Sequence, residues 1–212
     1  MNDPGGATSR LARIILAAGQ SRRMGQPKAL LPFGRRKVIE RVIEAGRSAA
    51  GPLVVVVNPR LREALGSGAG FEGAELVENA DPASEQIDSL RLGLKSLKAI
   101  SSTAPDGFFI HPVDYPLVGA DDYRALADEL GQGGDYEVFQ PACGQRHGHP
   151  VLCRYSLADR FLELPAGGTA RDVIRSARVR YVAVSNPGVA EDMDTPEDYD
   201  RLLELAGGEE PS

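Results

Sequence analysis

Residues 16–34 read LAAGQSRRMGQPKALLPFG and form the most informative segment of the chain. It overlaps the end of a short apolar run, 13–18, which has the length and composition of a buried strand. The loop that follows combines residues that let backbone amides approach an anion with residues that carry positive charge. These are Gly19, Gly25, Arg22, Arg23 and Lys28. Amide donors and cations at the end of a strand are what phosphate chemistry requires, so the loop is a candidate phosphate site.

The loop differs from two common phosphate-binding motifs. A Walker loop has four residues between its glycines and a lysine directly after the second one. Here five residues separate Gly19 from Gly25, and Lys28 lies three positions further on. The dinucleotide fingerprint G-x-G-x-x-G is absent from this stretch. Taken alone, a loop of this kind is equally compatible with a surface loop that carries solvated arginines.

Short apolar runs and helix-periodic segments alternate along the chain. Strands are expected at 13–18, 52–58, 74–77, 107–111, 136–141, 150–153 and 178–185. Helices are expected at 37–50, 61–65, 89–100, 121–130, 157–164, 169–177 and 196–205. This alternation predicts an α/β fold with a mostly parallel sheet and helices on both faces. We expect one domain over 11–206, between a disordered tail at 1–10 and a flexible tail at 207–212.

Composition narrows the class of protein. The 212 residues are 42% hydrophobic and 25% charged, as in soluble globular proteins, and the formal net charge is −6. An acidic chain is a poor general binder of nucleic acid, and no apolar run reaches the ~20 residues of a membrane span. The first ten residues lack the apolar stretch of a signal peptide, and the two cysteines form no C-x-x-C pair. We therefore expect a cytoplasmic protein with free thiols and no nucleic-acid or membrane partner.

Two carboxylates stand out by position. Asp114 follows the expected strand 107–111 in the string HPVDYP, where a carboxylate can hold Mg²⁺ or form an Asx-turn before Pro116. Asp194 lies in EDMDTPED, where Thr195 has the features of a helix N-cap. Capping explains Thr195 and the acids that follow it, but it explains Asp194 less well because Asp194 precedes the cap.

A second polar stretch contains two of the three histidines, His147 and His149, in GQRHGHPVL. Cys143 and Cys153 flank the pair, but C-x₃-H-x-H-x₃-C matches none of the common zinc spacings. A structural role is the more ordinary explanation for such a pair. Further on, the string PAGGTARD, 165–172, is typical of a helix start with Thr169 as cap.

Several separated motifs together resemble one family. The string 16–32 matches L-A-A-G-x-S-x-R-M-G-x-x-K followed by L-L-P, the signature of Rossmann-like nucleotidyltransferases, in particular the molybdenum cofactor cytidylyltransferases and related MobA-like enzymes. Residues 114–116 match its D-x-P element, 192–198 resemble D-[IV]-D-T-P-x-D, and 148–152 match G-H-P-[VI]-L. The resemblance covers about 13–203 and implies a three-layer α/β/α nucleotidyltransferase fold.

The resemblance also implies roles for individual residues. Arg23, Lys28 and Asp114 would be catalytic, and Asp114 and Asp194 would bind Mg²⁺. The nucleotide would be bound by Leu16, Ala17, Ala18, Gly19, Ser21, Arg23, Gly25, Lys28, Asn79 and Ser89. The acceptor would be bound by His149, Pro150 and Arg171.

The implied reaction is transfer of a nucleoside monophosphate from an NTP to molybdopterin or its molybdenum-loaded form, with release of pyrophosphate. Relatives with Ala-Ala-Gly at 17–19 tend to use CTP, whereas Ala-Gly-Gly resembles the users of GTP. Glu85-Gln86 replaces the Gly-Met of relatives in a segment expected near the nucleobase and ribose, which leaves base preference open. A molybdenum hydroxylase is a further expected partner.

Two other functions remain compatible with the sequence. One is nucleotidyl transfer to a sugar or polyol phosphate, because the same loop serves that chemistry. The other is a non-catalytic carrier of the molybdenum cofactor. Pyrophosphate release separates an enzyme from a carrier, and the choice of acceptor separates the two enzymes.

Overall fold

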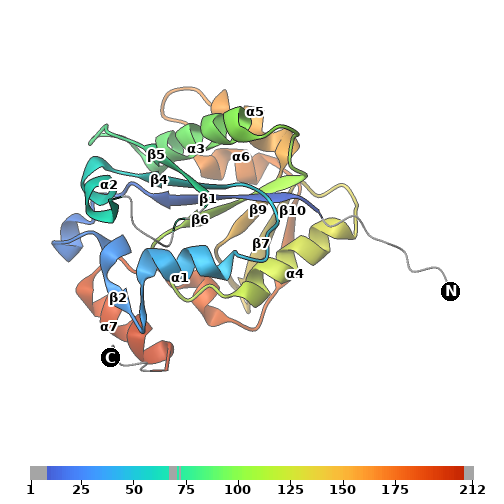
Figure 1. Ribbon diagram of the computed structural model, residues 1–212. Helices are drawn as coiled ribbons and strands as arrows, with labels where there is room; N and C mark the ends of the chain where they lie inside the picture. Colours follow the sequence, from blue (N-terminus) through green and yellow to red (C-terminus); the bar gives the residue numbers. More distant parts are fainter. Residues whose placement is uncertain (1–8, 67–70, 72, 208–212) are drawn as a thin grey trace.

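The computed structural model describes residues 9–66, 71 and 73–207, and the outer parts of both expected tails, 1–8 and 208–212, lie outside these residues. A central sheet is covered by helices on both faces (Figure 1). The sheet contains β1 Leu11–Ala17, β4 Leu53–Val57, β5 Ala74–Glu78, β6 Gly107–Pro112, β7 Val138–Cys143, β8 Arg146–His147, β9 Val151–Arg154 and β10 Val179–Ala183. A separate small hairpin joins β2 Pro32–Phe33 to β3 Arg36–Lys37.

The helices form the two outer layers. They are α1 Val38–Ala45, α2 Pro59–Leu65, α3 Gln86–Ile100, α4 Ala120–Gly131, α5 Ala158–Leu162, α6 Ala170–Ser176 and α7 Pro196–Leu205. Helices α3, α5 and α6 cover one face of the sheet, and α1 and α4 cover the other (Figure 1). This arrangement confirms the expected three-layer α/β fold. None of the helices among the described residues combines the length and apolar character that a membrane crossing requires.

The sheet is mostly parallel, with strand order β10-β7-β9-β6-β1-β4-β5 and β8 beside β7. Strand β1 is parallel to both β4 and β6, and β10 is parallel to β7. Strand β9 runs antiparallel to both β6 and β7. Only seven residues separate β7 from β9, whereas a parallel crossover needs about a dozen or more, so the chain must reverse here.

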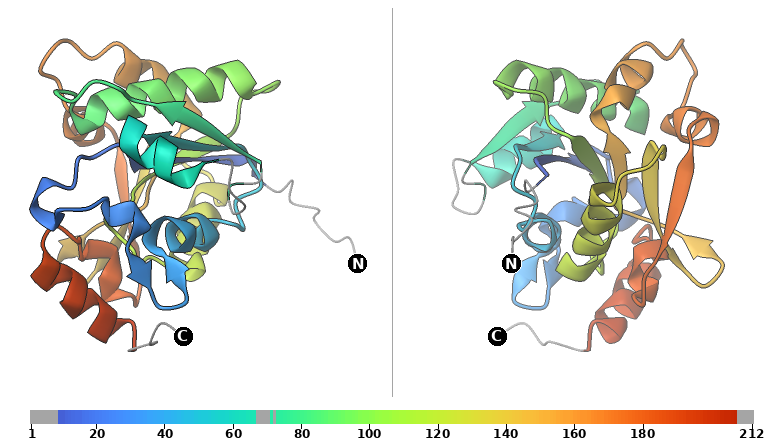
Figure 2. Two further views of the ribbon diagram at one scale, coloured as in Figure 1. Left: turned by 60° about the vertical axis from the view of Figure 1, so that its left-hand side comes forward. Right: turned by 90° about the vertical axis from the view of Figure 1, so that its right-hand side faces the viewer.

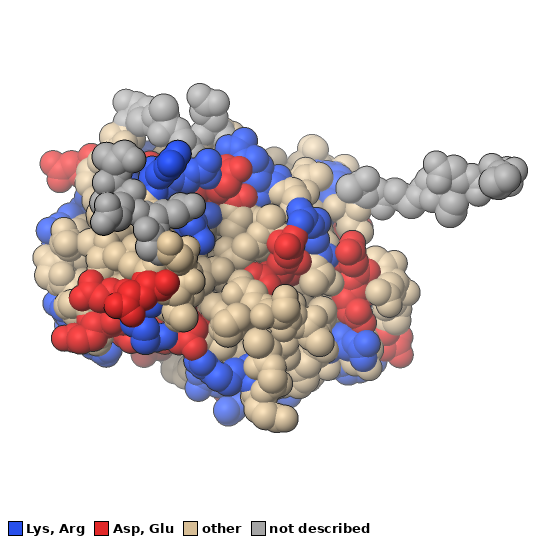
Figure 3. All heavy atoms as spheres, turned by 90° about the horizontal axis from the view of Figure 1, so that it is seen from below, with Lys and Arg blue, Asp and Glu red and all other residues tan. Residues whose placement is uncertain are grey.

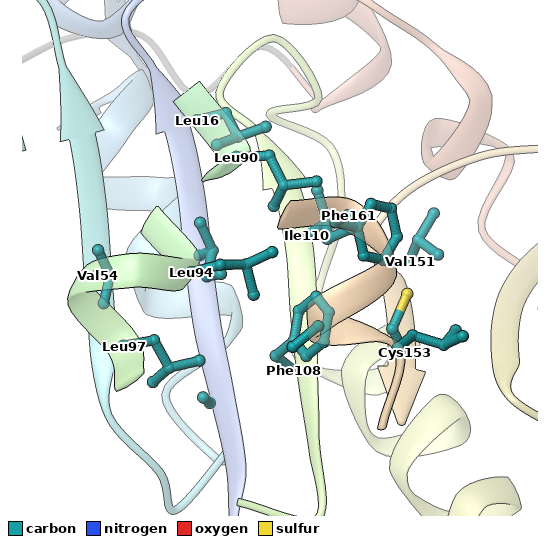
Figure 4. Close-up of a cluster of buried hydrophobic side chains, with 14 of the residues drawn as sticks. Leu16, Val54, Leu90, Leu94, Leu97, Phe108, Ile110, Val151, Cys153 and Phe161 are labelled. Carbon is teal, nitrogen blue, oxygen red and sulfur yellow. The ribbon is translucent and has the colours of Figure 1, made fainter. Parts of the chain in front are cut away.

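The core on the α3 side explains why that helix lies close to the sheet. Leu90, Leu94 and Leu97 project from α3 onto buried side chains of β1, β4 and β6 (Figure 4). Gly93 faces β1, and a Cβ atom built there would lie 2.6 Å from Cγ2 of Ile14. The absence of a side chain at Gly93 therefore sets the distance between helix and sheet.

Parallel pairing brings the carboxyl ends of three strands to one edge of the sheet. Leu16 of β1 is in register with Val56 of β4 on one side and with Pro112 of β6 on the other. The loops after these strands must therefore leave the sheet side by side, which is where open α/β sheets bind ligands. Two of these loops are the glycine-rich segment and the turn that carries Asp114.

Candidate active site

A cavity of about 500 Å³ opens at this edge of the sheet. Its walls come from the ends of β1 and β6, the loops after β1, β4 and β5, and Asp194 just before α7. The glycine-rich loop and α7 lie side by side in the left view of Figure 2, as the ion pairs of Asp194 require. Most of the residues expected to bind nucleotide line this cavity: Leu16, Ala17, Ala18, Gly19, Ser21, Arg23, Lys28 and Ser89. Gly25 and Asn79 do not.

The glycine-rich loop is held by hydrogen bonds from its own side chains and from a neighbouring loop. Ser21 has a left-handed backbone, φ 49°, which is unusual for a residue with a side chain. Its Oγ accepts a hydrogen bond from the backbone N of Lys28 at 3.1 Å, which closes the loop. Gly25 also has positive φ, 69°, so its predicted place in the loop has a conformational reason.

Asn58 positions this loop from outside, a role that the sequence analysis did not assign. Its Nδ2 donates to the carbonyls of Ala18 and Gly19, at 3.2 and 3.1 Å. Its Oδ1 accepts from the N of Leu61 at 2.8 Å and so caps α2. The available signal was the string Asn58-Pro59 at a strand end, which indicates an N-cap but not the contact with the loop after β1.

Asn79 lies beneath the cavity and holds the loop after β5. It is 6% exposed, and its Nδ2 donates to Oγ of Ser84 at 3.0 Å and of Ser89 at 2.9 Å. Its Oδ1 accepts from the N of Asp81 at 3.3 Å. Because these contacts occupy its amide, Asn79 shapes the loop that lines the cavity. Gln20 joins the two loops across the cavity by donating to the carbonyl of Pro82.

The three candidate catalytic charges meet at one end of the cavity. Lys28 Nζ lies 2.6 Å from Oδ1 of Asp194 and 3.9 Å from Oδ2 of Asp114. Arg23 pairs with the other oxygen of Asp194 at 3.1 Å. Thr195 caps α7, accepting from the N of Asp198 at 3.2 Å, so capping accounts for Thr195 and leaves Asp194 to face the cations. Residues 166 positions apart in sequence thus form one charge cluster.

The carboxylate of Asp114 has features that suit a ligand of a cation. Its Oδ1 is buried and has no hydrogen-bond partner among the described residues. Burial raises the pKa of Asp114 to about 6 against the opposing effect of the Lys28 charge. The hydrogen bond from Lys28, by contrast, lowers the pKa of Asp194. In the described part of the chain no three His, Cys, Asp or Glu side chains cluster as a metal site. Asp114 and Asp194 both approach Nζ of Lys28, and Mg²⁺ is usually bound by one or two carboxylates together with phosphate and water, so these two residues fit such a cation.

These pKa shifts predict how cation binding depends on pH. A proton and a divalent cation compete for Asp114, while Asp194 stays ionised over the same range. We expect the affinity for Mn²⁺, measured without nucleotide by electron paramagnetic resonance, to be constant above pH 7 and to fall about tenfold per unit below pH 6. Asp114→Asn should bind weakly with no such slope. An equal slope in that variant would assign the titration to another group.

The residues expected to bind the acceptor lie beside this cluster rather than in the cavity. The ring of His149 packs against Tyr115, with centroids 4.5 Å apart, and Tyr115 follows Asp114. Burial lowers the pKa of His149 to about 4, so its ring is uncharged at neutral pH. Pro150 is buried just before β9. Burial raises the pKa of Tyr115 to about 12, and the charge of Arg171, an exposed residue at the start of α6, opposes this rise.

The other features of this region are structural. Thr169 is at the N-cap position of α6, as expected, but its side chain accepts no hydrogen bond from the helix; Asp172 instead accepts one from the N of Thr169 at 2.8 Å. His147 packs on Tyr181 with ring centroids 4.1 Å apart. Cys153 is buried in the core, and no metal cluster involving these histidines is present among the described residues.

Basic and acidic side chains are interspersed over the face seen in Figure 3, and neither sign covers its described part. At the cavity, Arg23 and Lys28 lie among the lining residues together with the carboxylates of Asp114 and Asp194. Local cations in an acidic protein suit a small anionic ligand better than an extended polyanion.

Comparison with known proteins agrees with this geometry. The MobA-like NTP transferase domain matches residues 13–182. The molybdenum cofactor cytidylyltransferase of Escherichia coli K12 is 23% identical over 186 residues, covering 88% of this chain and 92% of its own length. The molybdenum cofactor guanylyltransferase of Polynucleobacter asymbioticus is 26% identical over 200 residues, covering 91% and 95%.

Solved structures show the same fold. The homologue of Mycobacterium tuberculosis Rv0371c from Mycobacterium sp. strain JC1 has a TM-score of 0.78 at 27% identity, covering 96% of this chain and all of its own. Rv0371c itself has also been solved in complex with manganese, with a TM-score of 0.73 at 24% identity and coverage of 92% and 99%. The family domain spans most of the chain and includes the glycine-rich loop, Lys28 and Asp114, so this protein is a nucleotidyltransferase that belongs to the MobA-like NTP transferase family.

Proposed function

We propose that this enzyme transfers CMP from CTP to a molybdopterin-type acceptor in molybdenum cofactor biosynthesis, with release of pyrophosphate. The observation that carries the proposal is the cluster of Lys28, Asp114 and Asp194 beside the glycine-rich loop. Relatives that align over nearly their whole length are named for this pathway, one as a cytidylyl- and one as a guanylyltransferase. Ala17-Ala18-Gly19 favours CTP over GTP by its resemblance to CTP users.

The residues of the chain have distinct tasks in this reaction. The loop amides, Arg23 and Lys28 bind and orient the triphosphate. Asp114 and Asp194 would hold a divalent cation, for which we propose Mg²⁺. When bound, the cation neutralises negative charge on the phosphates. Catalysis then consists mainly of positioning and charge stabilisation.

The transfer step needs no strong general base. An acceptor phosphate is largely ionised near neutral pH, so its oxygen can attack the α-phosphorus directly. The new P–O bond forms as the bond from the α-phosphorus to the bridging oxygen breaks, and pyrophosphate leaves with that electron pair. His149 is uncharged and stacked on Tyr115, which suits a positioning role at the acceptor side. Arg171 is the proposed partner of the acceptor phosphate.

Choice of the base would fall to the loop after β5. Asp81, Glu85 and Gln86 line the cavity, and Glu85 and Gln86 replace the Gly-Met seen in relatives. Their carboxylate and amide groups can accept hydrogen bonds from the exocyclic amine of a pyrimidine or a purine. The nucleotidylated acceptor would pass to a molybdenum hydroxylase, the partner that the resemblance implies.

The deciding experiment measures pyrophosphate release with Mg²⁺, each of the four NTPs in turn, and molybdopterin as acceptor. Release with CTP alone is the expected result. Release with GTP alone would keep the reaction and change the nucleotide. Release only with a sugar or polyol phosphate as acceptor would overturn the acceptor. No release with any NTP, together with tight binding of the cofactor, would instead indicate a carrier.

A further inference from the structure

The turn that carries Asp114 is held by its backbone from three directions. The carbonyl of Asp114 accepts a hydrogen bond from the N of Met193 at 2.9 Å. The carbonyl of Tyr115 accepts from Nε2 of His111 at 3.1 Å, and that of Pro116 accepts from Nε of Arg41 at 2.7 Å. Three consecutive carbonyls are thus fixed by residues from three separate segments, which leaves the backbone that carries Asp114 with little freedom to move.

His111 is the unusual member of this set. It lies on β6 with none of its surface exposed, and its Nδ1 is 2.7 Å from the hydroxyl of Tyr123 on α4. A carbonyl oxygen only accepts hydrogen bonds, so Nε2 must carry the proton that goes to Tyr115. In the neutral ring Nδ1 is then the acceptor, and the Tyr123 hydroxyl must be the donor. A single arrangement of protons therefore satisfies the hydrogen bonds from the Tyr123 hydroxyl through the His111 ring to the Tyr115 carbonyl.

The burial of this pair argues that the arrangement is stable. Tyr123 is 1% exposed and packs on Phe109 with ring centroids 4.6 Å apart. Burial lowers the pKa of His111 to about 3, which keeps the ring neutral at physiological pH. A buried polar ring is costly unless both nitrogens are paired, and here both are. An apolar side chain would fill the same space without fixing the turn.

We propose that His111, oriented by Tyr123, is a positioning residue for the nucleotidyl transfer reaction. Through the Tyr115 carbonyl it fixes the turn that presents the Asp114 carboxylate to the divalent cation. This inference rests on the proposed function, because it takes Asp114 as the cation ligand. It extends the site from the cavity to α4, none of which lines the cavity.

Two substitutions of His111 separate positioning from packing. The side-chain nitrogen of glutamine can take the place of Nε2 and still donate to the Tyr115 carbonyl, whereas that of asparagine takes the place of Nδ1 and cannot reach it. We expect His111→Asn to weaken Mn²⁺ binding and lower kcat by about 10- to 100-fold, as loss of outer-sphere partners of metal ligands does. His111→Gln should retain most of both, while the KM for nucleotide changes little in either variant.

The measurements are Mn²⁺ affinity without nucleotide by electron paramagnetic resonance, steady-state pyrophosphate release, and thermal melting, all on the full chain. Tyr123→Phe keeps the ring and removes the donor to Nδ1, and it should show a smaller loss of the same kind. The proposal is overturned if both His111 variants bind Mn²⁺ and turn over like the wild type. It is also overturned if both lose function equally, in proportion to their loss of melting temperature. Failure of the proposed function appears separately, as absence of pyrophosphate release by the wild type, and leaves the Mn²⁺ comparison intact.

Discussion

Asp114→Asn is expected to lower kcat/KM for nucleotidyl transfer by about 10³-fold or more. The substitution preserves size and removes the charge that would hold the cation, which contributes several kcal/mol of charge stabilisation in phosphoryl chemistry. Asp114 is the more buried of the two carboxylates, and its free Oδ1 has no other partner among the described residues. If the charge of Asp114 is removed, no neighbouring side chain can therefore replace it.

The same substitution should stabilise the metal-free protein. The pKa of Asp114 is raised from 3.8 to about 6, so the folded chain binds this proton more tightly than the unfolded chain does. The free energy of unfolding therefore decreases as pH rises from about 4 to about 6. Asparagine does not ionise, so the variant should not show this decrease. We expect Asp114→Asn to melt a few degrees higher than the wild type at pH 7.5, with the difference vanishing near pH 4.

Asp121→Asn is the matched control, since Asp121 is an exposed residue of α4 whose side chain is 89% exposed. It should change neither turnover nor the pH dependence of melting. If Asp114→Asn melted lower than the wild type at every pH, the carboxylate would be a structural partner of Lys28. A residual activity within tenfold of the wild type would place the metal elsewhere.

The fold was largely predictable because its signals are local. Apolar runs such as 52–58 and 107–111 became the central strands β4 and β6, with each end shifted by at most one residue. The expected helix 37–50 was too long, since α1 ends at Ala45 and Gly46 follows it. Glycine has low helix propensity, but the apolar periodicity around it obscured that boundary.

Other features depend on contacts between distant residues and carry no local signal. The hairpin of β2 and β3 consists of two-residue strands, which are too short to show a period. The antiparallel direction of β9 follows from the short connection through β8, not from its own composition. Periodicity identifies a strand, whereas pairing partners are set by the chain that surrounds it.

The residues of the candidate site also fall into a group that the sequence predicts and a group that it does not. The motif residues Lys28, Asp114 and Asp194 were predicted individually, and the structure shows how close they lie. The residues that hold them were not predicted, because Asn58 and His111 act through carbonyls of other loops. A backbone carbonyl looks the same whatever the residue type, so such contacts leave no mark on the motif.

Lys28→Met is expected to change cation and nucleotide binding in opposite directions. The Lys28 ammonium lies 2.6 Å from Asp194 and 3.9 Å from Asp114, so it occupies the space that faces both candidate metal ligands. A cation that binds alone must overcome its charge. Removal of that charge should strengthen Mn²⁺ binding by about tenfold at pH 8, where Asp114 is ionised in the wild type.

Turnover should fall in the same variant by about 10²- to 10³-fold, the usual effect of deleting one preorganised group that stabilises transition-state charge. Lys95→Met is the control, because Lys95 is exposed on α3 and does not line the cavity. It should leave Mn²⁺ affinity and pyrophosphate release unchanged.

The variant is informative because Mn²⁺ affinity and turnover are expected to change in opposite directions. If Lys28 only supported the two carboxylates, its loss would let them repel each other and weaken cation binding along with turnover. If it serves the triphosphate, its ammonium must exchange the ion pair with Asp194 for contacts with phosphate when nucleotide and cation bind together. Tighter Mn²⁺ binding with slower turnover therefore supports a Lys28 that moves from the carboxylates to the phosphates of the nucleotide. A decrease in both Mn²⁺ affinity and turnover would instead indicate that Lys28 keeps the two carboxylates in position.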